Sequence, residues 1–406
     1  MPDPITWYAL GKEVADPTLI EEEIDTKILL HNQDASAHGQ SSESLYNHRI
    51  SELLDHISYS IYNIKMNPAA RIYKAIVGYG FEADFTTLQA AIDWSNLYNG
   101  GTVFVKKGTY TITDDIVLYN NIEIEGEDND TVIFDFNSGA YQFKLIGTSG
   151  THKKNCWLRN IQIKNSRKGT DGAVYFSYVD DSGIVNCKIS NNKKSVGSYG
   201  PAVNLSNCKR ISVEDNYFTD NQISVNASGC THTKIYRNEF DGDDNSSIWL
   251  ASGVSNFIFN NLIRNAAENG ITVDSSDKSQ IIGNYIDTYT VQAISTGENN
   301  PTHYLIISNN EILNGAVNSG AIDLTFGSYR CVVSNNVLYN NDGYGIWLNP
   351  ADYCTVIGNT VSYGGTGIRI ETDSDKNVIV GNVCLNNSFN LVDGGTATEL
   401  GHNITA

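Results

Sequence analysis

The chain is poor in methionine, in positive charge and in long apolar runs, and each shortage excludes a class of protein. Its 406 residues include 2 methionines and carry a net charge of -19, from 27 Lys and Arg against 46 Asp and Glu. Nucleic-acid binders need a basic stripe, so this balance argues against them. No apolar run approaches the roughly 20 residues of a membrane span, and Met1–Pro4 does not open a signal peptide. We expect neither nucleic acid nor membrane as a partner.

Catalytic and cofactor signatures are also missing. The sequence has no Gly-x-Ser-x-Gly elbow and no phosphate-binding loop. Its cysteines include no Cys-x-x-Cys pair with a neighbouring histidine, so we expect no metal and no cofactor. Between residues 156 and 394 there is no helical periodicity either, which excludes a helical repeat there.

What is present instead is a short repeat built around asparagine, as in Ile281–Ile286 (Ile-Ile-Gly-Asn-Tyr-Ile). The steps between successive asparagines are 22, 23, 23, 26, 26, 23 and 23 residues, within the range of solenoid repeats. Cys187 and Ile161 stand at the same position in two earlier, looser copies. The repeated asparagines are Asn216, Asn238, Asn261, Asn284, Asn310, Asn336, Asn359 and Asn382.

Each repeat has a second apolar alternation ten to twelve residues after its asparagine, as in Ile248-Trp249-Leu250 and Ile346-Trp347-Leu348. Two short strands of period two, separated by Asn, Gly and Ser, describe one coil of a parallel β-helix. In stacked coils a buried asparagine at a corner can bond the same amide above and below, so we interpret the eight asparagines as structural.

The seven cysteines cannot all pair. Cys208 and Cys230 lie eight residues before their asparagines, and Cys331 and Cys354 lie five before theirs. Each pair should therefore stack, with backbones about 4.8 Å apart. Buried thiols that fill a core column are the simpler interpretation, with disulfides as the alternative.

The N-terminal region has a different pattern. Ile50, Leu54, Ile57, Ile61 and Ile64 are spaced 4, 3, 4 and 3 residues apart, and Asn47 precedes them at an a position. Isoleucine at d favours three or four strands, so we expect residues 41–67 to form a parallel trimeric coiled coil. A single amphipathic helix packed on its own chain is the competing interpretation.

Two stretches resemble known families. Phe81–Trp94 together with Gly100–Thr113, a short capped helix followed by strands, resembles the opening of pectate-lyase-superfamily β-helices. His31–Gly39 resembles stretches near the start of phage tail-fibre proteins. The resemblance implies an all-β, right-handed single-stranded parallel β-helix of about 10–12 coils behind an N-terminal coiled coil. It implies a phage tail spike or fibre, whose members are usually homotrimers that bind, and often cleave, bacterial surface polysaccharide.

On this interpretation the chain divides into five parts. Residues 1–40 attach to a tail or baseplate protein, 41–67 trimerise, and 68–101 form a linker and capping helix. Residues 102–395 form the β-helix and 396–406 a C-terminal cap. Such a protein would be made in the host cytoplasm without a signal peptide and would act on the virion tail or another extracellular particle.

Outward residues of the second strand should stack into columns on one long face. We expect one column to run Tyr175, Asn204, Ser224, Trp249, Thr272, Ser295, Asp323, Trp347 and Arg369. A second should run Asn226, Ala251, Asp274, Thr325, Asn349 and Glu371. Aromatic rings and fixed polar groups suit a sugar chain. Substrate-binding candidates are therefore Tyr175, Asn204, Trp249, Trp347, Asn349 and Arg369, although the tryptophans could instead contact a covering loop or another subunit.

Asp274, Asp323 and Glu371 are the candidate catalytic residues. Asp274 and Asp323 would lie two coils apart, as would Asp323 and Glu371, which corresponds to about 9.6 Å along the axis. That is slightly wide for an inverting pair of about 6.5–9.5 Å. Arg369 beside Glu371 should keep this carboxylate ionised, which suits a base. Solvated surface carboxylates with no catalytic role are the alternative.

Other interpretations remain open. Asp241–Asn245 is rich in oxygen ligands but lacks the downstream Glu of a calcium loop, so we expect a plain acidic turn. The Asp-Pro-His and Trp-Ile-Asp-His signatures of mannuronan epimerases and pectate lyases do not occur. A secreted lyase, hydrolase or epimerase of the same superfamily and a purely structural fibre subunit are the alternatives to a tail spike.

Overall fold

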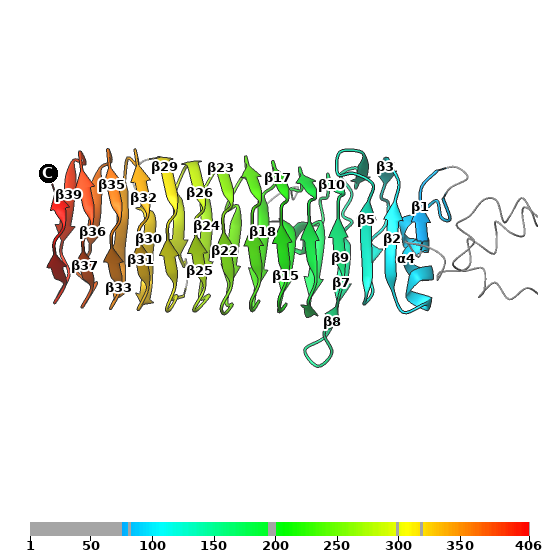
Figure 1. Cartoon of the computed structure of the whole chain (residues 1–406), viewed down its shortest axis with the longest axis horizontal. Helices are drawn as coiled ribbons and strands as arrows, with labels where there is room; N and C mark the ends of the chain where they lie inside the picture. The colour runs from blue at the N-terminus through cyan, green and yellow to red at the C-terminus, as the bar shows by residue number, and fades with distance from the viewer. Residues whose placement is uncertain (1–74, 80–82, 194–199, 298–299, 317–319, 406) are drawn as a thin grey trace, which may run out of the picture. The chain divides into compact units, whose positions relative to one another are not determined.

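A computed structural model describes residues 75–79, 83–193, 200–297, 300–316 and 320–405. The expected attachment region and coiled coil, including the seam from Ile50 to Ile64, lie outside the described residues. Residues 77–406 form one compact unit. Within it, three parallel sheets run the length of a stack of coils (Figure 1). The parallel β-helix is thus confirmed, with about thirteen coils rather than ten to twelve.

The first strand of each coil belongs to a 14-stranded sheet, here sheet A. Its strands in spatial order are β1 (Ala75–Val77), β2 (Gly101–Val105), β5 (Ile122–Gly126), β9 (Trp157–Arg159), β13 (Gly183–Val185), β16 (Ser212–Glu214), β19 (Lys234–Tyr236), β22 (Phe257–Phe259), β25 (Gln280–Ile282), β28 (Ile306–Ser308), β31 (Val332–Ser334), β34 (Thr355–Ile357), β37 (Val378–Val380) and β40 (Glu399–Gly401).

The next strand of each coil follows after a sharp corner and joins the 13-stranded sheet B. Its strands are β3 (Gly108–Thr111), β6 (Val132–Asp135), β10 (Gln162–Lys164), β14 (Lys188–Ser190), β17 (Tyr217–Thr219), β20 (Glu239–Asp241), β23 (Leu262–Ala266), β26 (Tyr285–Tyr289), β29 (Glu311–Gly315), β32 (Val337–Tyr339), β35 (Thr360–Ser362), β38 (Val383–Leu385) and β41 (Ile404–Thr405).

The third strand joins the 12-stranded sheet C, which carries the expected columns. Its strands are β4 (Ile116–Val117), β7 (Phe143–Ile146), β11 (Val174–Ser177), β15 (Pro201–Ser206), β18 (Ile223–Ser228), β21 (Ile248–Ala251), β24 (Asn269–Asp274), β27 (Gln292–Thr296), β30 (Gly320–Tyr329), β33 (Tyr344–Asp352), β36 (Thr366–Ile370) and β39 (Phe389–Asp393). A small pair, β8 (Lys153–Lys154) and β12 (Val179–Asp180), and a 3-10 turn, η3 (Gly169–Asp171), complete the elements.

Helix α4 (Leu88–Leu97) closes the N-terminal end of the stack, as its amphipathic pattern predicts. Leu88, Ala91 and Ile92 are buried. The Gln89 side chain accepts the Val117 N–H at 2.8 Å and donates to the Val117 carbonyl at 3.1 Å. Val117 lies on β4, the edge strand of sheet C, so the helix pairs backbone groups that an open edge leaves free. No helix among the described residues is long and apolar enough to cross a membrane.

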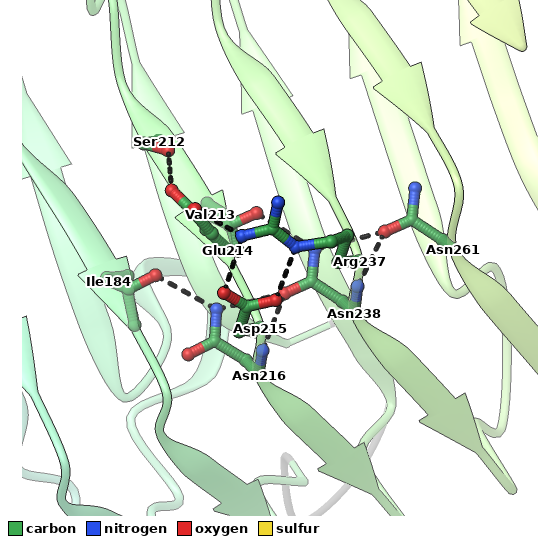
Figure 2. Close-up of polar contacts among 9 residues, drawn as sticks. All are labelled: Ile184, Ser212, Val213, Glu214, Asp215, Asn216, Arg237, Asn238 and Asn261. Carbon is green, nitrogen blue, oxygen red and sulfur yellow. Dashed lines mark hydrogen bonds and ion pairs between the residues drawn. The ribbon is translucent and has the colours of Figure 1, made fainter.

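Figure 2 shows the asparagine ladder, which lies at the corner between sheets A and B. Each Nδ2 donates to the Oδ1 of the next coil's asparagine at 2.9–3.0 Å, from Asn216 through Asn382 to Asn403. The same Oδ1 also accepts a backbone N–H, as in the Asn216 N–H bond to Asn238 at 3.0 Å. The eight asparagines are at most 2% exposed, so their structural role is confirmed. The ladder also includes Asn403, which the sequence pattern did not indicate.

A second polar column lies at the corner that follows sheet B. Asn192 and Asn221 stack there in successive coils, and the Asn192 backbone N–H donates to Asn221 Oδ1 at 3.1 Å. Asp243 stands at the same position one coil later and is 1% exposed, with its Oδ1 accepting the Ser224 hydroxyl at 2.8 Å. Burial raises the pKa of this carboxyl to about 7. A group that is ionised in most proteins is therefore held close to neutral here.

All seven cysteines are buried and none forms a disulfide. Cys208 and Cys230 occupy equivalent positions in successive coils, as do Cys331 and Cys354, since the residue after each pairs with the next coil. The Cys208 thiol donates to the Phe176 carbonyl at 3.3 Å. The columns of buried thiols are thus as expected.

Candidate functional site

The candidate site is the outer face of sheet C, where strand register decides which side chains share a column. Paired positions run Tyr175, Asn204, Asn226, Trp249, Thr272, Ser295, Asp323, Trp347 and Arg369. The prediction of Ser224 in this column was wrong. Asn226 occupies the place, and Ser224 is fully buried, where it bonds the side chains of Asn221 and Asp243.

A second column lies two residues further along each strand. It contains Ser206, Ser228, Ala251 and Asp274, and in later coils Thr325 and Asn349. Glu371 follows Arg369 by two residues, and its backbone N–H bonds the Leu348 carbonyl at 3.0 Å, so it extends this column. The prediction of Asn226 here was also wrong, because Ser228 pairs with Ala251.

The middle of this face is covered rather than open. Thr272, Asp274, Ser295, Asp323 and Thr325 are each at most 8% exposed, although they alternate with core residues. The turn after β27 contributes to the cover, because the Asn300 N–H donates to Asp274 Oδ1 at 3.1 Å. Asp274 is therefore bonded by backbone, and neither Asp274 nor Asp323 is the solvated surface carboxylate that the sequence left as an alternative.

Three coils beyond Asp274, side chains converge around Trp347. Its Nε1–H donates to Glu371 Oε1 at 3.1 Å, and its ring lies 4.9 Å from the ring of Tyr344. The Arg369 guanidinium donates to both Glu371 oxygens and lies 5.1 Å from the Tyr344 ring centre. The two tryptophans of the column are half-buried, not exposed as expected. We call Asp323, Tyr344, Trp347, Arg369 and Glu371 the Trp347 cluster.

The carboxylates of this cluster differ in charge state. The bond from Arg369, followed by that from Trp347, lowers the pKa of Glu371, as the sequence predicts. Asp323 is 1% exposed, and burial raises its pKa to about 7 even though Gln292 donates to its Oδ2. Its Oδ1 has no hydrogen-bond partner within the described residues. One carboxyl is thus held ionised while the other, two strands away in sheet C, is poised near neutral.

The other predicted residues lie further along the same face. Asn204 and Asn226 bond each other at 2.9 Å, and Asn204 also donates to the Thr170 carbonyl at 2.9 Å. Tyr175 pairs with Asn204, and half-buried Trp249 lies four strands from Trp347. Asn349 is half-buried beside Thr325. The structure therefore brings Asp323, Trp347, Arg369 and Glu371 together and leaves Tyr175, Asn204 and Trp249 apart from them.

Sequence reasoning missed Tyr344, a member of the Trp347 cluster, and Gln292, which bonds Asp323 of that cluster. Tyr344 opens β33 three residues before Trp347, and Gln292 opens β27. Both precede the apolar alternation that defined the columns. An aromatic or amide at the first position of a strand was the available signal.

The acidic turn at residues 241–245 has local partners. Asp241 accepts the Asn265 amide at 2.7 Å, and Asp244 pairs with Lys193 at 2.9 Å. Throughout the described residues there is no group of three or more His, Cys, Asp and Glu side chains that could hold a metal ion.

Known proteins share this architecture at low sequence identity. A surface adhesin of Streptococcus pneumoniae, PfbA, superposes with a TM-score of 0.61 at 17% identity, over 77% of this chain and 88% of its own. The catalytic unit of a GH87 α-1,3-glucanase from Streptomyces thermodiastaticus gives 0.64 at 15% identity, over 78% and 65%.

A tailspike protein of the E. coli bacteriophage HK620, solved in complex with a pentasaccharide, gives a TM-score of 0.56 at 12% identity, over 82% of this chain and 73% of its own. Identities this low show a common fold only. No curated protein matches the sequence of the chain.

Two family models match the repeat region. Residues 223–384 match the right-handed β-helix region, which gives the handedness of the coils. Residues 94–303, a little over half of the 406, match the model described as periplasmic copper-binding protein (NosD). The chain therefore belongs to the NosD family of right-handed β-helix proteins.

Proposed function

We propose that the protein is a phage or phage-like tail spike or fibre that binds bacterial surface polysaccharide through the outer face of sheet C. The observation that carries this proposal is the Trp347 cluster, which combines two aromatic rings with a bidentate Arg–carboxylate pair on one axial face. Sugar rings stack on aromatic planes, and their hydroxyls need polar groups fixed in place. Arg369 and Glu371 fix one another, so both are positioned before a ligand arrives.

The fold is compatible with this role. The neighbours include an adhesin, a glucanase and a tailspike with a bound pentasaccharide. The heptad seam from Ile50 to Ile64 supports assembly as a homotrimer, and the residues before it would attach to a tail or baseplate protein.

A binding experiment tests the proposal. The intact protein is screened on a glycan array of bacterial capsular and lipopolysaccharide chains, and the best oligosaccharide is titrated. Trp347→Ala should weaken its binding about tenfold, since a stacked aromatic contributes about 1–1.5 kcal/mol. Trp157→Ala is the matched control, because Trp157 is a half-buried tryptophan on the outer face of sheet A. A structural fibre would bind no glycan on the array, and sedimentation as a monomer would contradict the trimer.

Cleavage is a second candidate function, favoured by the opposite pKa shifts of Asp323, which is raised, and Glu371, which is lowered. Protonated Asp323 would donate its proton to the glycosidic oxygen as the bond to the anomeric carbon breaks. Ionised Glu371 would take a proton from a water that attacks the opposite face, giving inversion. They lie two coils apart, about 9.6 Å along the axis, and in neighbouring columns, which is wider than the roughly 6.5–9.5 Å of such a pair.

Release of reducing ends from the bound glycan would separate a depolymerase from a binding protein. Asp323→Asn should abolish release and leave oligosaccharide binding within about twofold, because the amide keeps the shape of the acid without its proton. Release by Asp323→Asn at the wild-type rate would exclude this assignment.

Copper, which the family description names, does not fit the described residues. The seven thiols are all buried, and burial raises the pKa of Cys187 to about 12 and that of Cys384 to about 11. Copper(I) is held by thiolates and thioethers, yet Cys187 and Cys384 stay protonated, and the described residues contain no cluster of three His, Cys, Asp or Glu side chains that could hold the ion. We therefore assign no copper chemistry to this part of the chain.

A further inference from the structure

The corner between sheets C and A carries side chains that its backbone does not favour. At most corners of the coil one residue adopts a left-handed conformation, which suits Asn, Gly and Asp. The corner between sheets A and B follows this rule at most coils, with Asn260, Gly283, Asn309, Asn335, Gly358 and Gly381. The corner between C and A holds Asp181, Arg210, His232 and Ser255 in earlier coils, and then Lys278, Tyr304, Arg330, Tyr353 and Lys376, with φ from 54° to 57° for the last five.

These five residues stack in successive coils. Each backbone N–H donates to the next coil at 2.9–3.0 Å, with Lys278 bonded to the His303 carbonyl, Tyr304 to Tyr329 and Arg330 to Asp352. Cation and tyrosine therefore alternate strictly along the axis, one per coil of about 4.8 Å. We call the five residues the corner strip.

The side chains of the corner strip are open to solvent, and two of its cations contact tyrosines. Tyr304 is 44% exposed and Tyr353 is 42% exposed. Lys376 donates to the Tyr353 hydroxyl at 2.9 Å and lies 4.9 Å from its ring centre. Arg330 donates to the Tyr304 hydroxyl at 3.3 Å and lies 5.0 Å from the ring of Tyr329. Arg330 and Lys376 thus lie over the rings of Tyr304 and Tyr353 and bond their hydroxyls, while both tyrosines keep part of their surface open to solvent.

The cations of the strip differ from arginines elsewhere in the coil. Within the described residues Lys278, Arg330 and Lys376 form no ion pair, whereas Arg210, earlier at the same corner, is bound by Asp181, and Arg237 at the A–B corner is bound by Glu214 and Asp215 (Figure 2). Asp277, Asp352 and Asp375 lie in the column before the strip, but Asp277 accepts from His303 and Asp352 from the Asp375 N–H. Backbone strain of this kind persists where other interactions or a function maintain it.

We propose that the corner strip binds an extended acidic polysaccharide lying parallel to the axis of the β-helix. Tyr304 and Tyr353 would stack on sugar rings, and Lys278, Arg330 and Lys376 would pair with carboxylates carried by every second sugar. A ligand with repeating units matches a site that repeats once per coil. Single-stranded nucleic acid also uses rings and cations, but its charge on every unit would meet the neighbouring carboxylates and a chain of net charge -19. This site is separate from the Trp347 cluster and does not depend on the function proposed for that cluster.

Hyaluronan oligosaccharide, in which acidic and neutral sugars alternate, is a suitable probe for the intact protein. We expect it to bind, and chito-oligosaccharide of the same length, which is neutral, to bind much more weakly. The double variant Tyr304→Asn with Tyr353→Asn should lose about tenfold or more in affinity, since two stacked rings are removed. Its melting temperature should stay the same or rise, because Asn suits the left-handed backbone. Arg330→Gln should also weaken binding.

Tyr363→Asn provides the matched control, because Tyr363 is an exposed, left-handed tyrosine (53% exposed, φ 59°) at the corner after sheet B. It should bind hyaluronan like the wild type. The proposal is overturned if the wild type does not bind the probe, if the double variant binds it equally well, or if single-stranded DNA competes more strongly than the acidic sugar. If Trp347→Ala abolishes binding and the double variant does not, the acidic chain lies on sheet C instead.

Discussion

The asparagine ladder and the outer columns of sheet C both contain one residue from each coil. They differ in whether the residue type is the same from one coil to the next. The ladder repeats one residue type, because each coil needs the same amide to bond the coils on both sides. The outer column changes from tyrosine to asparagine, tryptophan, aspartate and arginine over the same stack. In a solenoid, repetition of a side chain therefore marks the scaffold, and variation at a fixed position marks where the surface has been adapted.

Breaking the ladder should have the largest effect on stability. Asn261 accepts from Asn238 and donates to Asn284 and to the Ile235 carbonyl. Asn261→Ala leaves buried partners unpaired and should lower the free energy of unfolding by about 4 kcal/mol. Thermal and urea unfolding followed by circular dichroism would measure it. Asn340→Gly, at an exposed left-handed asparagine, is the control and should change stability by less than about 0.5 kcal/mol. Equal losses in both variants would contradict the contrast.

Asp243 stands where Asn192 and Asn221 stand in earlier coils of the second polar column, and its carboxyl group allows a pH-dependent test. Its folded pKa of about 7 is above the usual value, so its contribution to stability is present below pH 4 and is lost as pH rises to 7 and beyond. Asp243→Asn removes this titration and should stabilise the protein by about 2 kcal/mol at pH 8 while changing little at pH 4. Melting temperatures across this range would show a flatter profile for the variant. A profile parallel to that of the wild type would disprove the assignment.

Within the outer column, the length of the ligand should separate the two tryptophans. Trp249 and Trp347 are four strands apart in sheet C, about 19 Å along the axis. Trp249→Ala should therefore weaken binding of a long oligosaccharide about tenfold and leave a trisaccharide unaffected, whereas Trp347→Ala weakens both. Calorimetric titration with the two ligands checks this. Equal loss of trisaccharide binding in both variants would mean that Trp249 acts through the fold.

The smallest effect is expected at the corner strip. Lys278→Asn places a residue that tolerates left-handed φ where a lysine now has φ 56°, and should raise the free energy of unfolding by at most about 1 kcal/mol. Lys278→Ala keeps the energetic cost of a left-handed φ at a residue with a Cβ, so this variant should not stabilise the protein. Urea unfolding of the two variants gives the comparison. If Lys278→Ala also raised the free energy of unfolding, the increase would come from the loss of the lysine charge.

The ladder could be predicted because a polar residue that recurs between strands at a near-constant step indicates stacked coils with a buried amide at one corner. The strand register of sheet C was harder to predict. Ile223, Val225 and Ala227 all alternate with polar residues, so a shift of two residues preserves the pattern and placed Ser224 where Asn226 lies. A register shift of one residue would have placed the apolar side chains on the outer face, and the sequence pattern would have revealed this error.

The burial of Asp274 and Asp323 was not predicted, because it depends on the coils that follow Asn284 and Asn310. These are the two 26-residue steps; the first contains Asn300, and the second has an irregular register after Thr325. Alternation alone cannot show that such a turn covers the strand of a neighbouring coil, as Asn300 does Asp274. The longer steps were the available signal.

The bonds of the asparagine ladder depend only on the neighbouring coils and not on position along the stack. A whole coil of about 23 residues could therefore be duplicated or deleted without altering the geometry of the rest. Such a molecule could change its length in fixed increments and exchange its surface one coil at a time. That would let its lineage acquire new ligands without redesigning the interior.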